Sequence, residues 1–154
     1  MKEVEQLIYQ RLIADKVSGG VLDLLGEDIT QNPVDVTRVI HSHQIATPPS
    51  PGLTYGITSS TAGHLTGDHS RTKEIFVTFN IYAQNHSEIA YRLMRLFDGQ
   101  VHDLSLISGG AVQVGGVSSV FDFEGPDGFD EGLNTQQKDL RFRFFVKPKA
   151  VAPI

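Results

Sequence analysis

The sequence has no cysteine among its 154 residues. Without thiols the chain cannot use a cysteine nucleophile, form disulfides or bind zinc through cysteine, so these classes of enzyme and metalloprotein are excluded. A single domain of this length buries roughly 70% of its unfolded surface and needs no covalent cross-link in order to fold. The absence of cysteine suits a reducing compartment but does not establish one.

Positive charge is also scarce. Thirteen Lys and Arg stand against eighteen Asp and Glu, which gives a formal net charge of -5, and no basic cluster is evident along the chain. Binding to DNA or RNA normally requires clustered cations that neutralise phosphates, so a nucleic-acid-binding protein is disfavoured. A protein that only lines a path for DNA is compatible with this charge.

Long hydrophobic runs are missing as well. The longest, such as residues 20–25, fall far short of the roughly 20 residues that a membrane span needs. The first six residues carry acids where a secretory signal would carry a cation followed by an apolar stretch. We therefore expect a soluble protein that is not secreted and has no membrane partner.

Two segments have the apolar spacing of amphipathic helices. Residues 2–16 predict the first helix, which the Ser-Gly-Gly sequence at 18–20 can end. Asn85 and Glu88 have the spacing of a capping box and predict a second helix over about residues 87–98. The two apolar stripes consist of Val4, Leu7, Ile8, Arg11 and Leu12 in the first helix, and Ile89, Leu93, Leu96 and Phe97 in the second.

Alternating side chains predict a sheet. The clearest strand covers residues 73–83, with Ile75, Val77, Phe79 and Ile81 facing the core. Further strands are expected at 34–41, 53–58 and 140–146, and residues 104–123 predict a strand pair or one bulged strand. Residues 21–32 fit either a helical turn or a buried strand, and the proline-rich segment 47–52 predicts an extended connector.

Two polar segments are predicted to be long loops. Residues 58–72 contain one large apolar side chain in fifteen positions, which predicts a mobile loop that is either a binding segment or a tolerated insertion. Residues 124–137 combine four acids with three glycines and one proline, which predicts a solvated acidic loop.

The order of these elements predicts an α+β fold, with a mostly antiparallel sheet backed by two helices. We expect a single domain over residues 1–147 and a C-terminal tail over 148–154. Phe76, Tyr82 and Phe145 fall on the strand faces opposite the core, so either helices or a partner must cover them.

No catalytic or cofactor motif is present. The sequence has no Gly-x-Ser-x-Gly elbow, phosphate-binding glycine loop or calcium-binding register, and no cofactor is expected. His41 and His43 lie on one side of an extended segment, as two metal ligands can, but no acid is tied to this pair by spacing. Surface or interface histidines are the favoured interpretation.

One family matches the succession of elements. The matching pieces are the helix EVEQLIYQRL at 3–12, the strand PGLTY at 51–55, the strand EIFVTFNIYA at 74–83, the helix SEIAYRLMRLFD at 87–98 and the strand KDLRFRFF at 138–145. Over about residues 1–147 the chain thereby resembles the tail terminator, or tail completion, proteins of long-tailed bacteriophages. The segment 58–72 departs from that pattern.

The resemblance implies a structural protein of the virion rather than an enzyme. It implies a ring, usually a hexamer, at the head-proximal end of the tail tube, which ends tube polymerisation and docks the tail to the head connector. The implied partners are further copies of the chain, the tail tube protein and the connector or stopper protein, with DNA passing through the lumen without specific binding. The implied location is the tail or neck of the virion, and the host cytoplasm during assembly.

Seven charged residues are candidate contacts for partners or neighbouring subunits. Those expected to face partners are Arg71 and Lys73, in and beside the segment 58–72, and Asp127, Asp130 and Glu131 in the acidic loop. Arg92 and Arg95, on the polar side of the second helix, are candidate intersubunit cations, although an ordinary solvated helix face explains them equally well.

Two alternatives stay open. One is another neck or tail component, either a head-closure or head-tail joining protein or a tail tube subunit that stacks on both of its faces. The other, less favoured, is a metal-dependent enzyme built on His41 and His43.

Overall fold

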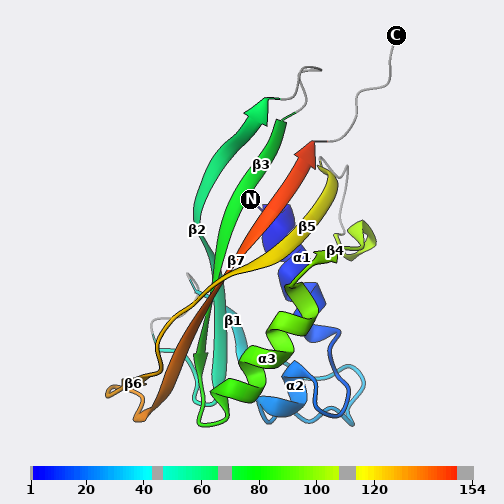
Figure 1. The fold of residues 1–154 in the computed structure, drawn as a ribbon. Coiled ribbons are helices and arrows are strands. Elements are labelled where there is room, and N and C mark those ends of the chain that lie inside the picture. The colour runs from blue at the N-terminus through cyan, green and yellow to red at the C-terminus, as the bar shows by residue number, and fades with distance from the viewer. Residues whose placement is uncertain (1, 43–46, 66–70, 108–113, 149–154) are drawn as a thin grey trace.

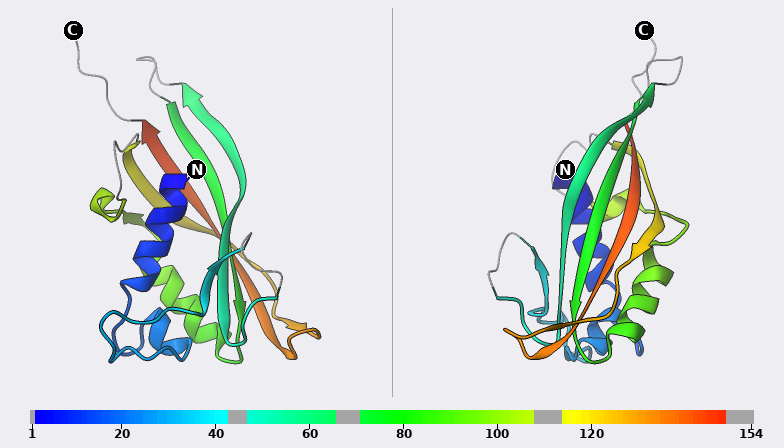
Figure 2. Two further views of the ribbon diagram at one scale, coloured as in Figure 1. Left: turned by 180° about the vertical axis from the view of Figure 1, so that it is seen from behind. Right: turned by 60° about the vertical axis from the view of Figure 1, so that its left-hand side comes forward.

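The computed structural model describes residues 2–42, 47–65, 71–107 and 114–148, and shows a twisted sheet with helices on one face (Figures 1 and 2). None of the described helices has the length and apolar character needed to cross a membrane. In chain order the elements are α1 (Lys2–Ile13), α2 (Val21–Leu24), β1 (Val39–His41), β2 (Gly52–Leu65), β3 (Arg71–Tyr82), α3 (His86–Phe97), β4 (Gln100–Val101), the 3₁₀ turn η1 (Leu104–Leu106), β5 (Val114–Glu124), β6 (Gly128–Asp130) and β7 (Thr135–Pro148).

The seven strands form one mixed sheet in the order β1-β2-β3-β7-β5-β4, and β6 pairs with β7. β1 pairs with β2 in parallel, and every other pairing is antiparallel. The central pair is β3 and β7, in which Phe79 lies opposite Leu140 and Ile75 opposite Phe144. The predicted α+β class, with a mostly antiparallel sheet, is confirmed.

The core lies between the sheet and the helices α1 and α3. Phe79 of β3 contacts Phe97 of α3 and Phe142 of β7, with ring centroids 5.3 and 5.6 Å apart. The predicted inward face of β3 is confirmed, since all four of its apolar side chains are fully buried, and so are the apolar members of the α1 stripe. These residues are Ile75, Val77, Phe79 and Ile81 in β3, and Val4, Leu7, Ile8 and Leu12 in α1.

Both predicted helices are present, with different ends. α1 stops at Ile13, three residues before the predicted end, and the chain turns back at Gly19, whose φ of 78° favours glycine. The undecided segment 21–32 begins with the single helical turn α2. α3 agrees with prediction to within one residue at each end, but the predicted capping box is wrong: the Asn85 side chain makes no cap hydrogen bond and instead donates from Nδ2 to the Leu24 carbonyl at 2.9 Å.

The predicted long loop 58–72 is wrong. β2 continues to Leu65 and β3 begins at Arg71, with Thr61 opposite Glu74, so most of the segment is a hairpin, and residues 66–70 lie outside the described part. A sparse apolar content did not prevent strand formation because main-chain hydrogen bonding to β3 requires no apolar side chain, and threonine favours extended backbone. Arg71 and Lys73 therefore belong to a strand rather than to a loop.

The predicted strand 34–41 is shorter than expected. β1 covers only Val39–His41, because Glu27 Oε1 accepts hydrogen bonds from the backbone amides of Thr37 at 2.9 Å and Arg38 at 2.7 Å. A carboxylate thus occupies donors that a longer strand would offer to its neighbour.

The C-terminal third contains more sheet than predicted. Of the two possibilities for residues 104–123, one bulged strand is observed: β5 is irregular between Val114 and Gly116 and again between Phe121 and Phe123. The predicted acidic loop contains the short strand β6, and β7 starts at Thr135 instead of residue 140. β7 also extends to Pro148, the first residue of the predicted tail, and residues 149–154 lie outside the described part.

Candidate interaction surfaces

The face of the sheet opposite α1 and α3 carries no described helix (Figure 2). It is formed by the alternate residues of each strand, and one row across it consists of Phe76 in β3, Arg143 in β7 and Val120 in β5. Phe76, Tyr82 and Phe145, which the alternation places on this face, are only partly buried. We call this surface the open face.

A set of stacked side chains occupies the middle of the open face, and we call it the arginine–aromatic ladder: Phe123, Arg141, Phe76, Arg143 and Phe145. The Arg141 guanidinium carbon lies 5.1 Å from the centre of the Phe76 ring and 5.6 Å from that of Phe123. Arg143 lies 5.7 Å from both the Phe76 and the Phe145 rings. These distances are within the range of cation–π attraction, so each arginine contacts two aromatic rings.

Two carboxylates fix the ladder from its sides. Arg141 Nε donates to Asp122 Oδ2 at 2.6 Å, and Arg143 donates to Glu74 Oε1 from Nε at 2.9 Å and from Nη2 at 2.7 Å. The arginine side chains are 45% and 40% exposed, whereas their carboxylate partners are 19% and 22% exposed. The surface presented to solvent is therefore richer in guanidinium than in carboxylate.

The other end of the open face is polar. Asn80 Nδ2 donates to Asp139 Oδ1 at 2.6 Å, and Gln137 Nε2 donates to the same oxygen at 3.2 Å. Burial, together with the carboxylates of Asp139 and Asp130, raises the pKa of Tyr82. This network fixes side chains of β3 and β7 at the end of the sheet near β6.

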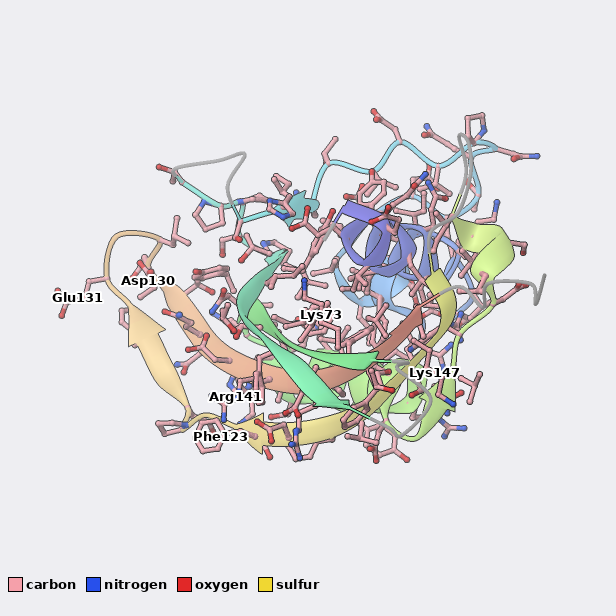
Figure 3. The ribbon with its side chains drawn as sticks, turned by 90° about the horizontal axis from the view of Figure 1, so that it is seen from above. Lys73, Phe123, Asp130, Glu131, Arg141 and Lys147 are labelled. Atoms are coloured by element: carbon pink, nitrogen blue, oxygen red, sulfur yellow. The ribbon has the colours of Figure 1, made fainter. Side chains whose placement is uncertain are left out.

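The hairpin of β6 and β7 carries the predicted acidic residues, and we call residues 124–131 the acidic corner. Lys138 Nζ pairs with Glu124 Oε1 at 2.8 Å and also with Asp127, and the hydrogen bond from Lys138 lowers the pKa of the Asp127 carboxyl. Asp130 Oδ1 accepts from the Leu133 amide at 2.9 Å, which shapes the turn. Figure 3 shows Asp130 and Glu131 at one end of the molecule and Lys147 at the other.

The structure thus brings Asp127, Asp130 and Glu131 together on one hairpin, and their contact with a partner stays a prediction. Within the corner Phe129 is 54% exposed, an apolar side chain that the sequence interpretation overlooked. The sequence offered a signal, since a single phenylalanine stands among five acids and glycines at 127–132.

Arg92 has a structural partner within its own chain. Its guanidinium donates from Nε to Asp15 Oδ2 at 2.8 Å and from Nη2 to Asp15 Oδ1, and Asp15 is 4% exposed. Burial by itself raises the pKa of Asp15, but the hydrogen bonds from Arg92 and from the Val21 amide outweigh it and hold that pKa below its usual value. The pair joins α3 to the turn between α1 and α2, so an intersubunit role for Arg92 would have to be additional to this contact.

Arg95 lies on the neighbouring surface. Its guanidinium carbon is 6.0 Å from the centre of the Tyr91 ring, and Tyr91 is 63% exposed. With Leu24, Glu88 and Arg92 these residues line a shallow groove of about 530 Å³ between α2 and α3. The two predicted intersubunit cations therefore share one groove, and their contact with a neighbouring subunit stays a prediction.

The remaining predicted cations lie at the other end of β3. Arg71 is the first residue of the strand, and its side chain lies outside the described part. Lys73 is partly exposed and pairs in register with Val146 of β7, on the helix side of the sheet (Figure 3). Their role in binding partners stays a prediction.

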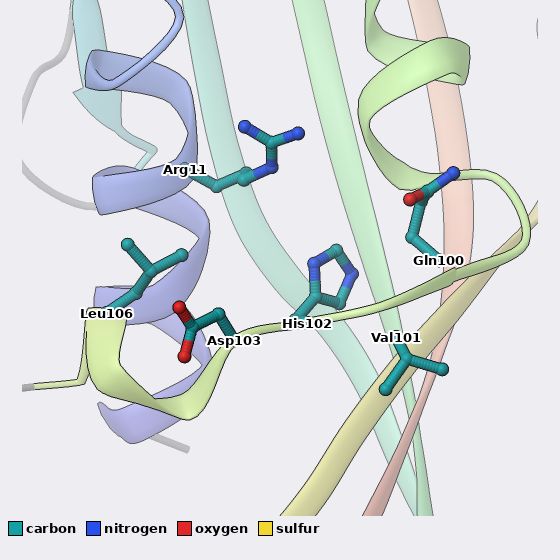
Figure 4. Close-up of a pocket in the computed structure, with 6 residues that line it drawn as sticks. All are labelled: Arg11, Gln100, Val101, His102, Asp103 and Leu106. Carbon is teal, nitrogen blue, oxygen red and sulfur yellow. The ribbon is translucent and has the colours of Figure 1, made fainter.

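His102, which lines a surface pocket of about 300 Å³ (Figure 4), forms a buried pair with Ser119. His102 Nε2 is 2.6 Å from Ser119 Oγ, while the Ser119 hydroxyl donates to the Phe97 carbonyl. Because that hydroxyl proton is already donated and Ser119 is fully buried, His102 acts as the donor and cannot serve as a base for a serine nucleophile. Burial, with a contribution from the Arg11 charge, lowers the pKa of His102 to about 4.

The histidine pair considered for metal binding is only half described. His41 Nε2 lies 3.1 Å from Glu5 Oε1, and the ring meets Tyr55 edge-on at 5.3 Å, whereas His43 lies outside the described part. Among the described residues no group of three or more His, Asp or Glu side chains is placed to hold a metal ion.

Comparison with known proteins identifies the fold. No protein-family model matches the chain, and no curated protein matches it. Among solved structures, a chain described as part of the virion of a native gene transfer agent particle matches with a TM-score of 0.56 and 16% sequence identity. The match covers 91% of this chain and 91% of that chain, so the two share essentially their whole fold.

Proposed function

We propose that this protein is a structural component of a virion, and specifically the tail terminator that forms a ring at the head-proximal end of a phage tail tube. The observation that carries the proposal is the fold likeness to a chain of a virion particle, which extends over 91% of both chains. The step from this fold likeness to a shared role is an analogy between folds, so ring formation is the property to test on this protein.

The distribution of surfaces supports assembly into a ring. The open face, the groove between α2 and α3, and the acidic corner are unlike one another. Figure 1 shows α2 and α3, which line the groove, on the other side of the sheet from the β6–β7 hairpin that carries the acidic corner. Contacts between unlike patches repeat by rotation and close into a ring when the rotation divides a full turn. Such a ring has two different ends, so it can bind the last ring of a tube on one side and a connector on the other.

The charge supports passage of DNA rather than binding. A net charge of -5 provides no excess of cations that would hold phosphates to the wall of a lumen. DNA can then move through the ring during packaging and ejection.

The test is native mass spectrometry of the purified protein over a range of concentrations, together with negative-stain electron microscopy. We expect closed rings of one mass, which do not grow into filaments at high concentration. Long tubes would contradict a terminator and favour a tail tube subunit, because only such a subunit stacks on both faces. A chain that stays monomeric at every concentration and in finished particles would contradict ring formation altogether.

The metal-enzyme alternative has a separate test. Elemental analysis of the purified protein would revive it only if a stoichiometric metal were found and were lost on replacing His41 or His43.

A further inference from the structure

The arginine–aromatic ladder has the properties of a docking surface that is organised before binding. Each guanidinium group is hydrogen-bonded to a carboxylate and lies within cation–π distance of two aromatic rings. Fixing side chains in advance reduces the conformational entropy lost on association. Arginine and large aromatic residues are also the types that contribute most to protein–protein binding.

The ladder still has unused binding capacity. Arg141 donates from Nε to Asp122, and an arginine carries five N–H donors, so its terminal nitrogens can donate to a further carboxylate. Phe123 at the end of the ladder is 53% exposed, which leaves one ring face for a second apolar group. The surface therefore fits a partner that combines carboxylates with an aromatic side chain.

The acidic corner of the same chain has this combination. Glu131 is exposed, Phe129 is 54% exposed, and the four carboxylates of residues 124–131 have only the ammonium of Lys138 as a described ionic partner. Figures 1 and 2 show that the hairpin of β6 and β7 projects from the end of the sheet on the side away from the helices, so its tip can reach another molecule.

We propose that the acidic corner of one subunit docks on the arginine–aromatic ladder of the next, and that this head-to-tail contact is the repeating interface of the ring. In it Phe129 packs against the exposed ring of Phe123, and the Glu131 carboxylate pairs with Arg141. The two patches are unlike, as a head-to-tail contact that closes into a ring requires. They adjoin at Phe123 and Glu124 of β5, and Glu131 and Phe129 lie beyond that point, on the β6–β7 hairpin. This inference rests on the proposed function.

The test uses charge reversal at both patches, with ring mass measured by native mass spectrometry. Arg141→Glu and Glu131→Lys each place like charges opposite one another, and we expect each to weaken subunit association by on the order of 100-fold or more. Lys16→Glu and Asp35→Lys change the net charge identically at exposed sites outside both patches and outside the groove, and they are the matched controls, in which ring mass should be unchanged.

Mixing the two reversed variants gives the decisive result. In a ring with an even number of subunits, such as the hexamer that the resemblance implies, alternating copies restore an opposite-charge pair at every interface. Rings should therefore reappear in the mixture and contain both variants in equal amounts. If either substitution prevented ring formation by damaging the fold of its own subunit, mixing the two variants could not restore rings.

Phe123→Ser and Phe129→Ala provide a second route if Arg141→Glu fails to fold, since both remove exposed rings without leaving a buried cavity. We expect either to reduce ring formation at least tenfold, with an unchanged unfolding midpoint. If the wild-type protein forms rings and none of the four interface variants changes their mass, the inference is wrong and the proposed function stands. If the wild-type protein forms no ring, both the inference and the proposed function are wrong.

Discussion

The stability of this protein should depend on pH through one buried histidine. His102 is 7% exposed, donates from Nε2 to Ser119 Oγ, and stacks on Phe144 at 5.6 Å with an interplanar angle of 9°. A proton added to Nδ1 would place a cation among aromatic rings and near Arg11, with Asp103 lining the adjacent pocket. Burial therefore lowers its pKa from 6.5 to about 4 in the folded protein.

The sign and the size follow from proton linkage. Between pH 6.5 and about 4 the unfolded chain binds a proton at this histidine and the folded chain does not, so acid favours unfolding. The contribution of neutral His102 to the free energy of unfolding is fully present above pH 6.5 and falls as the pH decreases from 6.5 to about 4. Lowering the pH from 7 to 5 should reduce the free energy of unfolding by about 2 kcal/mol through His102 alone.

The assay is urea unfolding followed by circular dichroism at several pH values, for the wild type and for His102→Gln. Glutamine carries an amide nitrogen that can replace Nε2 as the donor to Ser119, but it does not titrate. We expect the wild type to lose about 2 kcal/mol more than the variant between pH 7 and pH 5. Asp15, whose pKa is lowered, loses its contribution only below its ordinary value of 3.8, outside this range. Parallel pH profiles for the two proteins would refute the reasoning.

Three further predictions concern the fold. Asp15→Ala leaves the Arg92 guanidinium without its carboxylate and should lower the free energy of unfolding, measured by chemical denaturation, by about 3 kcal/mol. Arg92→Lys should keep only part of the pair's stability, because an ammonium cannot bind both carboxylate oxygens as a guanidinium does. Equal stability of Asp15→Ala and wild type would contradict this. Phe79→Ala removes a fully buried ring that contacts Phe97 and Phe142 and should cost about 3–5 kcal/mol, measured in the same way, with exposed Tyr91→Ala as the control. Gly20→Ala places a Cβ 2.6 Å from the Asp15 carbonyl oxygen, so its thermal midpoint should fall, whereas Gly116→Ala, with no neighbouring atom closer than 4.0 Å, is the matched control expected to keep the wild-type midpoint.

The ion pair between Asp15 and Arg92 makes Arg92 a poor position for testing the intersubunit role of the α3 cations. Alanine at Arg92 weakens the fold as well as any intersubunit contact, so a lost ring would have two explanations. Alanine at Arg95, whose described contact is the exposed Tyr91 ring, tests the intersubunit role more cleanly. An unchanged ring mass in that variant would reject a role for Arg95 in the interface.

Local pattern was sufficient for the parts of the fold that face the core. The alternation in β3 and the helical spacing in α1 and α3 predicted the buried side chains because burial of one face imposes a period on the sequence. Pattern failed where no face is buried or where side chains compete for the backbone. The hairpin at 58–65 is held by main-chain pairing. Glu27 shortens the predicted strand 34–41 to β1 by accepting hydrogen bonds from the Thr37 and Arg38 amides.

The candidate surfaces were harder to predict because exposed side chains impose no period on the sequence. Asp127, Asp130 and Glu131 lie within five residues of one another, so their clustering on one hairpin could be seen in the sequence. The arginine–aromatic ladder could not, because Phe76, Phe123 and Arg141 come from three strands whose register depends on two bulges in β5 and on the pairing of β3 with β7. The Asp15–Arg92 pair joins residues 77 positions apart and depends on how α3 packs near the α1–α2 turn.

The amino-acid sequence by itself determined the absence of thiol chemistry, the acidic charge, the two amphipathic helices and the inward faces of the central strands, because these follow from composition and from short-range periodicity. Only the tertiary structure decided which face of the sheet stays uncovered, which side chains meet on it, and which charged residues are engaged within the chain. Those outcomes depend on strand order and register, which arise from contacts between residues far apart in the sequence.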